Sequence, residues 1–186
     1  MTLVKNRALP HQRVHGDAQG IETPLRLTGA LRGVKFTVPG KKSRFGWLDC
    51  RLVLALDELA ALLSQYQVNE VRVDSFYRPK AHLQGRKNKL SQHAFGLAMD
   101  VTEFKMKDGS ELNIERDFAG TLGRPVCGPQ ARLTEETPQS RPLRDLVCAI
   151  ARSGIFNNTL TPNFNAAHHN HLHLDITKGA RYIEVK

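Results

Sequence analysis

The densest group of potential metal ligands lies near the C-terminus, in the stretch NAAHHNHLHLDI (residues 165–176). Half of the eight histidines of the chain fall within six positions there: His168, His169, His171 and His173. A neutral imidazole is the commonest protein ligand for metals and a general acid or base near neutral pH. The stretch is therefore compatible with a metal site, although histidines that only form hydrogen bonds or lie at the surface are more common.

Within this stretch, HLHLDI (171–176) alternates polar and apolar residues, which predicts a β-strand. Its leucine and isoleucine side chains then share the face that suits the core, while His171, His173 and Asp175 share the opposite face. A purification tag would not alternate with leucines in this way. We expect one histidine of this strand to act as a ligand together with residues from elsewhere.

A second group of potential ligands lies upstream, in SQHAFGLAMDV (91–101). His93 and Asp100 would be far apart in a straight strand, but Gly96 can take backbone angles that let the chain turn between them. Asp100 lies among apolar residues, where a carboxylate is costly unless a cation or strong hydrogen bonds receive it. With one histidine of the later strand, these residues give three ligands. Catalytic zinc sites have three protein ligands and a fourth position for water, whose pKa the metal lowers.

Two amphipathic helices and several strands are expected to position these groups. Apolar residues at helical spacing predict a helix over 48–66 with Asp49 as its N-cap, and a second helix from Ser140, which we expect to cap it, to about Ser153. Residues 105–140 are rich in glycine, proline and charge and are expected to contain little regular structure.

Strands are predicted over 68–76, 97–104 and 171–176, and residues 25–39 suit a hairpin or edge strands. Residues 157–165 are expected to form a loop. The pattern predicts an α+β fold, with a small antiparallel sheet that carries the metal site and is flanked by helices.

The length of 186 residues suits one domain, which we place at residues 25–186 after a loosely structured N-terminal arm of residues 1–24. The net charge of +9 fits an anionic partner, although it also fits simple solubility. The basic residues are scattered and aromatic residues are few, so no nucleic-acid module is predicted. No apolar run approaches the ~18–20 residues of a membrane span, and no signal peptide is visible at the N-terminus.

The three cysteines, Cys50, Cys127 and Cys148, are widely spaced and contain no CxxC pair, which argues against a thiolate zinc site. One disulfide with a remaining thiol and three buried thiols are equally compatible with this spacing.

The motif SQHAFGLAMD (91–100) resembles the SxHxxGxAxD motif of the D-Ala-D-Ala-type zinc peptidases, which share a fold with lysostaphin-type endopeptidases and the zinc domain of hedgehog proteins. With SFYRP (75–79) and LTPNFNAAHHNHLHLD (160–175), the sequence is most similar to the extensin-like C-terminal domain family of bacteria. The resemblance covers roughly residues 45–178.

The resemblance implies one zinc ion per chain, held by His93, Asp100 and His173. It implies that His171 contacts the reacting oxygen and that His168 lines the site, because penicillin-insensitive murein endopeptidases have a similar HxxHxH arrangement. The carboxypeptidase branch has an acidic base three residues before its last ligand, where this chain has Asn170. This difference favours the endopeptidase-like mechanism, with His171 as the base.

The resemblance also implies that Arg78 holds a substrate carboxylate, although a solvated turn arginine is an alternative. Ser91, Asp175 and Tyr77 are candidates for orienting the ligands, and for each of them an ordinary structural hydrogen bond is at least as common.

These features predict a zinc-dependent metallopeptidase that hydrolyses peptide bonds in peptidoglycan stems or cross-links with a metal-activated water, in the periplasm or outside the cell. The alternative is a catalytically inactive zinc-containing module that binds the cell wall. The residues do not select between D,D and L,D bonds or indicate an oligomeric state.

Overall fold

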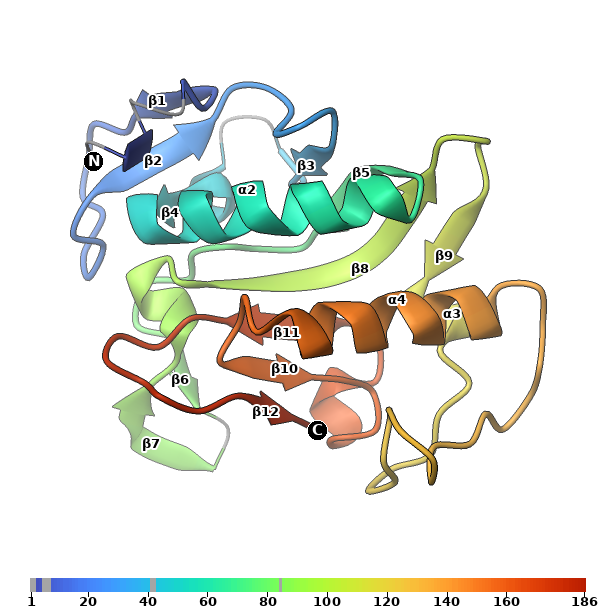
Figure 1. Ribbon diagram of the computed structural model, residues 1–186. Helices are drawn as coiled ribbons and strands as arrows, with labels where there is room; N and C mark the ends of the chain where they lie inside the picture. The colour runs from blue at the N-terminus through green and yellow to red at the C-terminus, as the bar shows by residue number, and fades with distance from the viewer. Residues whose placement is uncertain (1–2, 5–7, 41–42, 84) are drawn as a thin grey trace.

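The structure is a computed structural model that describes residues 3–4, 8–40, 43–83 and 85–186, without the side chain of Lys87. Figure 1 shows helices α2 and α4 lying on the same side of a central sheet, next to each other. The expected α+β class is therefore confirmed. The helices and 3-10 turns are α2 (Cys50–Gln65), α3 (Ile114–Asp117), α4 (Ser140–Ser153), η1 (Arg44–Gly46), η2 (Gln92–Phe95) and η3 (Ala166–His168).

The central sheet of the described residues contains seven strands in the spatial order β12, β10, β11, β8, β5, β3, with β9 also paired to β8. These strands are β3 (Lys35–Thr37), β5 (Val68–Val73), β8 (Ala98–Met106), β9 (Glu111–Asn113), β10 (Asn158–Leu160), β11 (Leu172–Asp175) and β12 (Glu184–Val185). The prediction of an antiparallel sheet is confirmed for the centre, where β11, β8 and β5 pair. It is wrong for the two edges, where β3 runs parallel to β5 and β12 runs parallel to β10.

Both predicted helices are present, but they begin differently. Asp49 caps α2 as expected, because its Oδ1 accepts from the Arg51 amide at 3.0 Å. Ser140, expected to be the cap of α4, is instead its first residue. The Thr137 hydroxyl accepts from the Ser140 amide at 3.0 Å, and the Ser140 hydroxyl accepts from the Thr137 amide at 2.8 Å. This reciprocal pair resembles a capping box and satisfies the amides of Thr137 and Ser140 at the start of the helix.

The N-terminal residues are more ordered than expected. Strand β1 (His11–Arg13) pairs with β2 (Pro24–Leu27), which pairs in turn with β4 (Leu48–Asp49). Val4 and Ile21 are buried and β1 is paired, so the arm is ordered at these positions, whereas residues 14–23 contain no helix or strand. Part of the arm, at 1–2 and 5–7, lies outside the described residues. Strands β2 and β3 belong to different sheets and form no hairpin together, although β3 is an edge strand as predicted.

The stretch 105–140 contains more structure than predicted, because β8 continues to Met106 and is followed by β9 and α3. The expected loop at 157–165 likewise contains β10. A disulfide between Cys127 and Cys148 joins the remaining irregular segment to α4. With a sequence separation of 21, this crosslink restricts the unfolded chain enough to stabilise the fold by about 3 kcal/mol.

The two faces of β8 and β11 differ in polarity around Asp100 and His173. Their apolar side chains pack in the hydrophobic core beneath the helices: Met99, Val101, Leu172 and Leu174. Side chains alternate along a strand, so Asp100, His173 and Asp175 emerge on the face away from that core. No helix among the described residues has the length and apolarity needed to cross a membrane.

Candidate metal centre

Strand register and one glycine bring three distant residues together. Strands β11 and β8 pair so that His173 lies directly opposite Asp100. His93 belongs to η2, which ends at Gly96 in the left-handed conformation, with φ of 62°. A Cβ at Gly96 would lie 3.0 Å from the Asp49 amide nitrogen, so this turn favours glycine both in conformation and in space. The predicted turn between His93 and Asp100 is confirmed.

The ligand atoms of His93, Asp100 and His173 form a nearly equilateral triangle. His93 Nε2 lies 3.0 Å from Asp100 Oδ1 and 3.2 Å from His173 Nδ1, and the third side measures 3.0 Å. Atoms bound to zinc at about 2.0–2.1 Å in a tetrahedron lie about 3.3 Å apart, so the triangle is close to one face of that tetrahedron. All three side chains are buried. This group, called the metal centre below, can therefore hold a metal ion.

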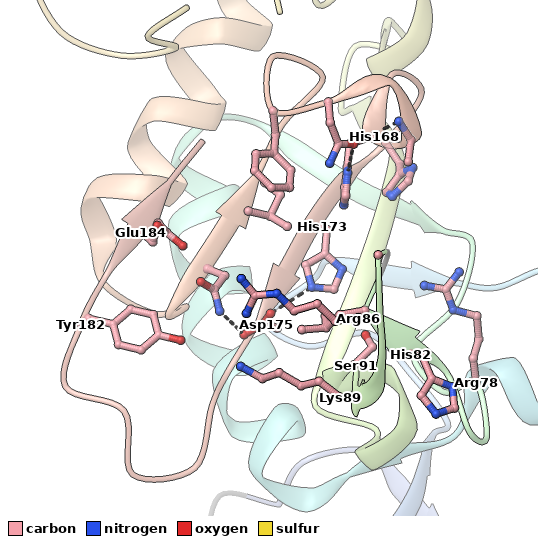
Figure 2. A pocket seen from close by; sticks show the side chains of 18 residues that line it. Arg78, His82, Arg86, Lys89, Ser91, His168, His173, Asp175, Tyr182 and Glu184 are labelled. Carbon is pink, nitrogen blue, oxygen red and sulfur yellow. Dashed lines mark hydrogen bonds and ion pairs between the residues drawn. The ribbon is translucent and has the colours of Figure 1, made fainter. Parts of the chain in front are cut away.

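Both imidazoles of the metal centre are oriented through their second nitrogen. His93 Nδ1 donates to the Phe76 carbonyl at 3.1 Å. His173 Nε2 donates to Asp175 Oδ2 at 2.9 Å, as Figure 2 shows. Such hydrogen bonds leave the other nitrogen of each ring available for a metal. Asp175 thus contacts one of these imidazoles, as its place on the same strand face predicts. Its other oxygen accepts from Asn158 Nδ2 at 2.8 Å, a contact that the sequence analysis missed because Asn158 was assigned to a loop.

Without a metal, the Asp100 carboxylate and the His173 imidazole stabilise each other in the charged form. Burial raises the pKa of Asp100, but hydrogen bonds with His173 and His93 outweigh it and hold that pKa well below the usual range. Burial lowers the pKa of His173, but hydrogen bonds with Asp100 and Asp175 outweigh it and raise the pKa to about 9. His93 lies in the same place, yet burial lowers its pKa despite Asp100. One proton on His173 therefore occupies the position that a metal would take.

Arg78 contacts the metal centre directly. Its Nη2 lies 3.0 Å from Asp100 Oδ2, the oxygen that does not face the histidines, and its side chain is 43% exposed. The backbone holds it there, because the Arg78 amide donates to the His93 carbonyl at 3.1 Å. Arg78 Nε is buried without a hydrogen-bond partner among the described residues. A guanidinium has five N–H donors, so Arg78 retains donors for a ligand while it pairs with Asp100.

His168 and His171 lie beside the metal centre. His171 Nε2 is 3.7 Å from Asp100 Oδ1, and the His168 ring centroid is 5.1 Å from that of His171 and 6.1 Å from that of His173. Burial, together with the neighbouring histidines, lowers the pKa of His168 to about 4. Burial also lowers the pKa of His171. Both rings are therefore neutral near pH 7.

Two asparagines that the sequence analysis did not single out for this purpose orient these neutral rings. His168 Nδ1 lies 2.7 Å from Asn165 Oδ1, and His171 Nδ1 lies 2.8 Å from Asn170 Oδ1. Asn165 Oδ1 also accepts from the Ala167 amide, which shows that this atom is an acceptor. Each Nδ1 then donates, and each Nε2 keeps a lone pair. The spacing Asn165–His168 was visible in the sequence, but η3 was not predicted.

Ser91 and Tyr77, the other expected orienting residues, differ from each other. The Ser91 hydroxyl accepts from the His93 amide at 3.3 Å and so caps the turn that carries this ligand. The Tyr77 hydroxyl instead donates to the Gln19 carbonyl at 2.9 Å, and the structure therefore places it in a contact with the N-terminal segment.

A cleft of about 710 Å³ opens onto the metal centre. His168, His171 and His173 line it, whereas His169 is 62% exposed and lies 3.8 Å from Glu115, outside the cleft. A separate two-stranded hairpin, β6 (His82–Leu83) and β7 (Arg86–Leu90), forms one wall. Figure 2 shows Tyr182 and Glu184 on the opposite side.

Comparison with known proteins identifies the family to which the chain belongs. No curated protein matches the sequence. Residues 5–184 match the family described as "Extensin-like protein C-terminus", and this range contains the metal centre, both asparagines and the cleft. The chain therefore belongs to the family of extensin-like protein C-terminal domains.

Proposed function

We propose that this protein is a zinc-dependent peptidase that hydrolyses peptide bonds in the stems or cross-links of peptidoglycan. The observation that carries the proposal is the combination of three ligand atoms about 3 Å apart with two neutral histidines beside them in one cleft. A site that only stabilised the fold would not need an open side lined by further histidines, since structural zinc sites are closed by four protein ligands.

The residues around the metal centre can carry out the proton transfers of hydrolysis. A bound zinc ion would lower the pKa of a coordinated water and polarise the scissile carbonyl. The Nε2 of His171 is unprotonated, because the Nδ1 of that ring donates to Asn170. This Nε2 lies 3.7 Å from Asp100 Oδ1, beside the metal centre. It can accept the proton of the attacking water and return it to the leaving amine nitrogen. The remaining donors of Arg78 can orient a substrate carboxylate.

The disulfide and the charge of the chain support a location at the cell wall. Disulfides such as Cys127–Cys148 persist in oxidising compartments, which include the periplasm and the cell exterior. The net charge of +9 favours association with anionic polymers. Both features fit a periplasmic or secreted enzyme that acts on peptidoglycan.

The second candidate function is a zinc-containing module that binds the wall without hydrolysing it. One observation favours this candidate: the position at which related carboxypeptidases have an acidic base is Asn170, whose side chain contacts His171. An amide cannot accept a proton at neutral pH. The two candidates therefore differ in whether His171 alone can act as the base.

The test is elemental analysis of the purified protein combined with mass spectrometry of a muropeptide digest, with and without a chelator. We expect one zinc per chain and cleavage that the chelator stops, with product masses that identify the bond. The exposed His169→Ala variant is the matched control for His171→Ala, because it removes the same ring from the same segment outside the cleft. Zinc without cleavage in several types of peptidoglycan would favour the binding module, and no zinc after reconstitution would contradict both candidates.

A further inference from the structure

The β6–β7 hairpin brings two cations into the cleft. Arg86 and Lys89 line the cleft, and Figure 2 shows both side chains reaching from the hairpin toward Asp175. The hairpin is tied to the metal centre at its base, because the Ser91 amide donates to the Ala81 carbonyl at 2.9 Å, just before the turn that carries His93. The hairpin that carries both cations is therefore joined at its base to the segment that carries His93.

The acidic groups of the cleft are already engaged with other residues. Asp175 accepts from His173 and Asn158, and Glu184 pairs with Lys186 at 2.7 Å. Among the residues that the structure describes, neither Arg86 nor Lys89 forms an ion pair. A cleft wall that presents a guanidinium and an ammonium without carboxylate partners is suited to an anionic ligand.

We propose that Arg86 and Lys89 bind a free carboxylate of the peptide substrate and so make the cleft selective for stem peptides whose carboxylates are not amidated. This inference rests on the proposed function, since it names the substrate group that the same cleft selects. A guanidinium binds a carboxylate through two parallel hydrogen bonds, and an adjacent ammonium adds a third charged donor.

The rest of the cleft favours a peptide over a phosphate-rich polymer. Phe164 and Tyr182 are partly exposed aromatic side chains that line the same cleft, together with Leu160 and Leu83. These surfaces can pack against the aliphatic side chains and backbone of a peptide, whereas a phosphate polymer offers mainly charge. The cations and the apolar surfaces together match a peptide that carries an isolated carboxylate.

The experiment compares two synthetic stem peptides that share a free C-terminal carboxylate, which Arg78 can orient, and differ only in whether their internal carboxylates are free or amidated. Binding is measured by calorimetry with the full chain carrying His171→Ala, so that the peptides are not cleaved. We expect the free carboxylate to improve affinity about tenfold, in line with a charge-assisted hydrogen bond at a partly exposed site. Adding R86Q and K89Q should reduce this preference to less than about twofold and leave the affinity for the amidated peptide unchanged.

The control variant K35Q/K107Q removes two exposed cations outside the cleft and should retain the tenfold preference. Thermal melting of R86Q/K89Q should match that of its parent, since both side chains are exposed. Equal binding of the two peptides by the parent, or an unchanged preference in R86Q/K89Q, would overturn the inference.

Cleavage by the wild-type chain is measured separately, so the two proposals can fail independently. If the wild type cleaves neither peptide but R86Q/K89Q abolishes the binding preference, the carboxylate site is supported and the hydrolase proposal fails. If the wild type cleaves both peptides and the His171→Ala parent binds them equally, the hydrolase proposal is supported and the carboxylate site fails.

Discussion

The two pairs of histidines in this site are the same residue type in contrasting surroundings. His93 and His173 are buried in the metal centre, and their second nitrogens donate to a backbone carbonyl and to a carboxylate. His168 and His171 lie in the cleft, and their second nitrogens donate to asparagine side chains. The second nitrogen of each ring donates one hydrogen bond, and only for His173 is the acceptor of that bond a charged group.

The surroundings of the rings give them different charges. Against the effect of burial, two carboxylates raise the pKa of His173 to about 9, while burial and neighbouring histidines lower that of His168 to about 4. A carboxylate partner makes an imidazole a stronger metal ligand, whereas an amide partner leaves it neutral and able to accept a proton. Under the proposed function, metal binding falls to the first pair and proton transfer to the second, and the following variants test this division.

The largest effect is expected from Asp100→Ala, which removes one ligand atom and the shared partner of His173 and Arg78. Metal affinity should fall about 1,000-fold, because zinc binding worth about 10–16 kcal/mol is divided among only a few ligands. Competition against a chelator gives the affinity, and thermal melting should show that added zinc no longer stabilises the protein. Wild-type affinity in this variant would place the metal elsewhere.

His171→Ala should separate the two pairs of histidines. We expect zinc content to stay at one per chain, while hydrolysis of the muropeptide falls about 100- to 1,000-fold through loss of the base. Elemental analysis and turnover on the same sample provide both numbers. Activity close to that of the wild type in the zinc-loaded variant would remove His171 from the mechanism.

Asp175→Asn replaces the carboxylate that accepts from His173 Nε2 by an amide, which is the kind of acceptor that His171 has in Asn170. The amide can still accept from His173 Nε2 but no longer carries charge, and its NH₂ group would face the Asn158 donor. Metal affinity should fall about 10- to 100-fold, as is usual when the partner of a ligand is changed. Chelator competition measures it, and an unchanged affinity would mean that the carboxylate does not tune this ligand.

Metal binding should depend on pH through His173. In the metal-free protein its pKa is raised to about 9, so below that pH a proton must leave before Nδ1 can bind a metal. Apparent affinity should therefore rise about tenfold per pH unit up to this pKa and then level off. Calorimetry in buffers of different ionisation enthalpy counts the released proton, and binding without proton release would contradict the assignment.

Asn170→Asp makes the converse change by placing a carboxylate beside His171 Nδ1. The new charge should raise the pKa of His171, with a modest effect because the substituted side chain at position 170 is only partly buried and remains in contact with solvent. Since the neutral ring is the base, activity is lost as pH falls through its pKa, and the acid limb should move up by about half a pH unit. The pH profile of turnover shows the shift, and movement in the opposite direction would contradict the role of His171 as base.

The local parts of the site could be predicted because each depends on a short pattern. Alternation in HLHLDI placed His173 and Asp175 on the polar face of a strand, and Gly96 marked the turn between His93 and Asp100. The motifs also indicated the family, which the match over residues 5–184 confirms.

Contacts between distant segments could not be predicted in the same way. Asn158 belongs to a strand that the composition of residues 157–165 does not indicate, and the parallel edges of the sheet involve partners far apart in the chain. The pairing of Cys127 with Cys148 was equally open, because sequence spacing does not specify which side chains meet.

By itself, the sequence determined the two apolar helix faces, the alternating strand and the types of ligand, because each of these follows from residue types over a few turns or strand positions. Only the tertiary structure decided the rest. The register of β11 against β8 sets His173 opposite Asp100, and the packing of η2 adds His93 and Arg78 to the same carboxylate. These contacts depend on which strands pair and in what register, which is a property of the whole fold rather than of any short stretch.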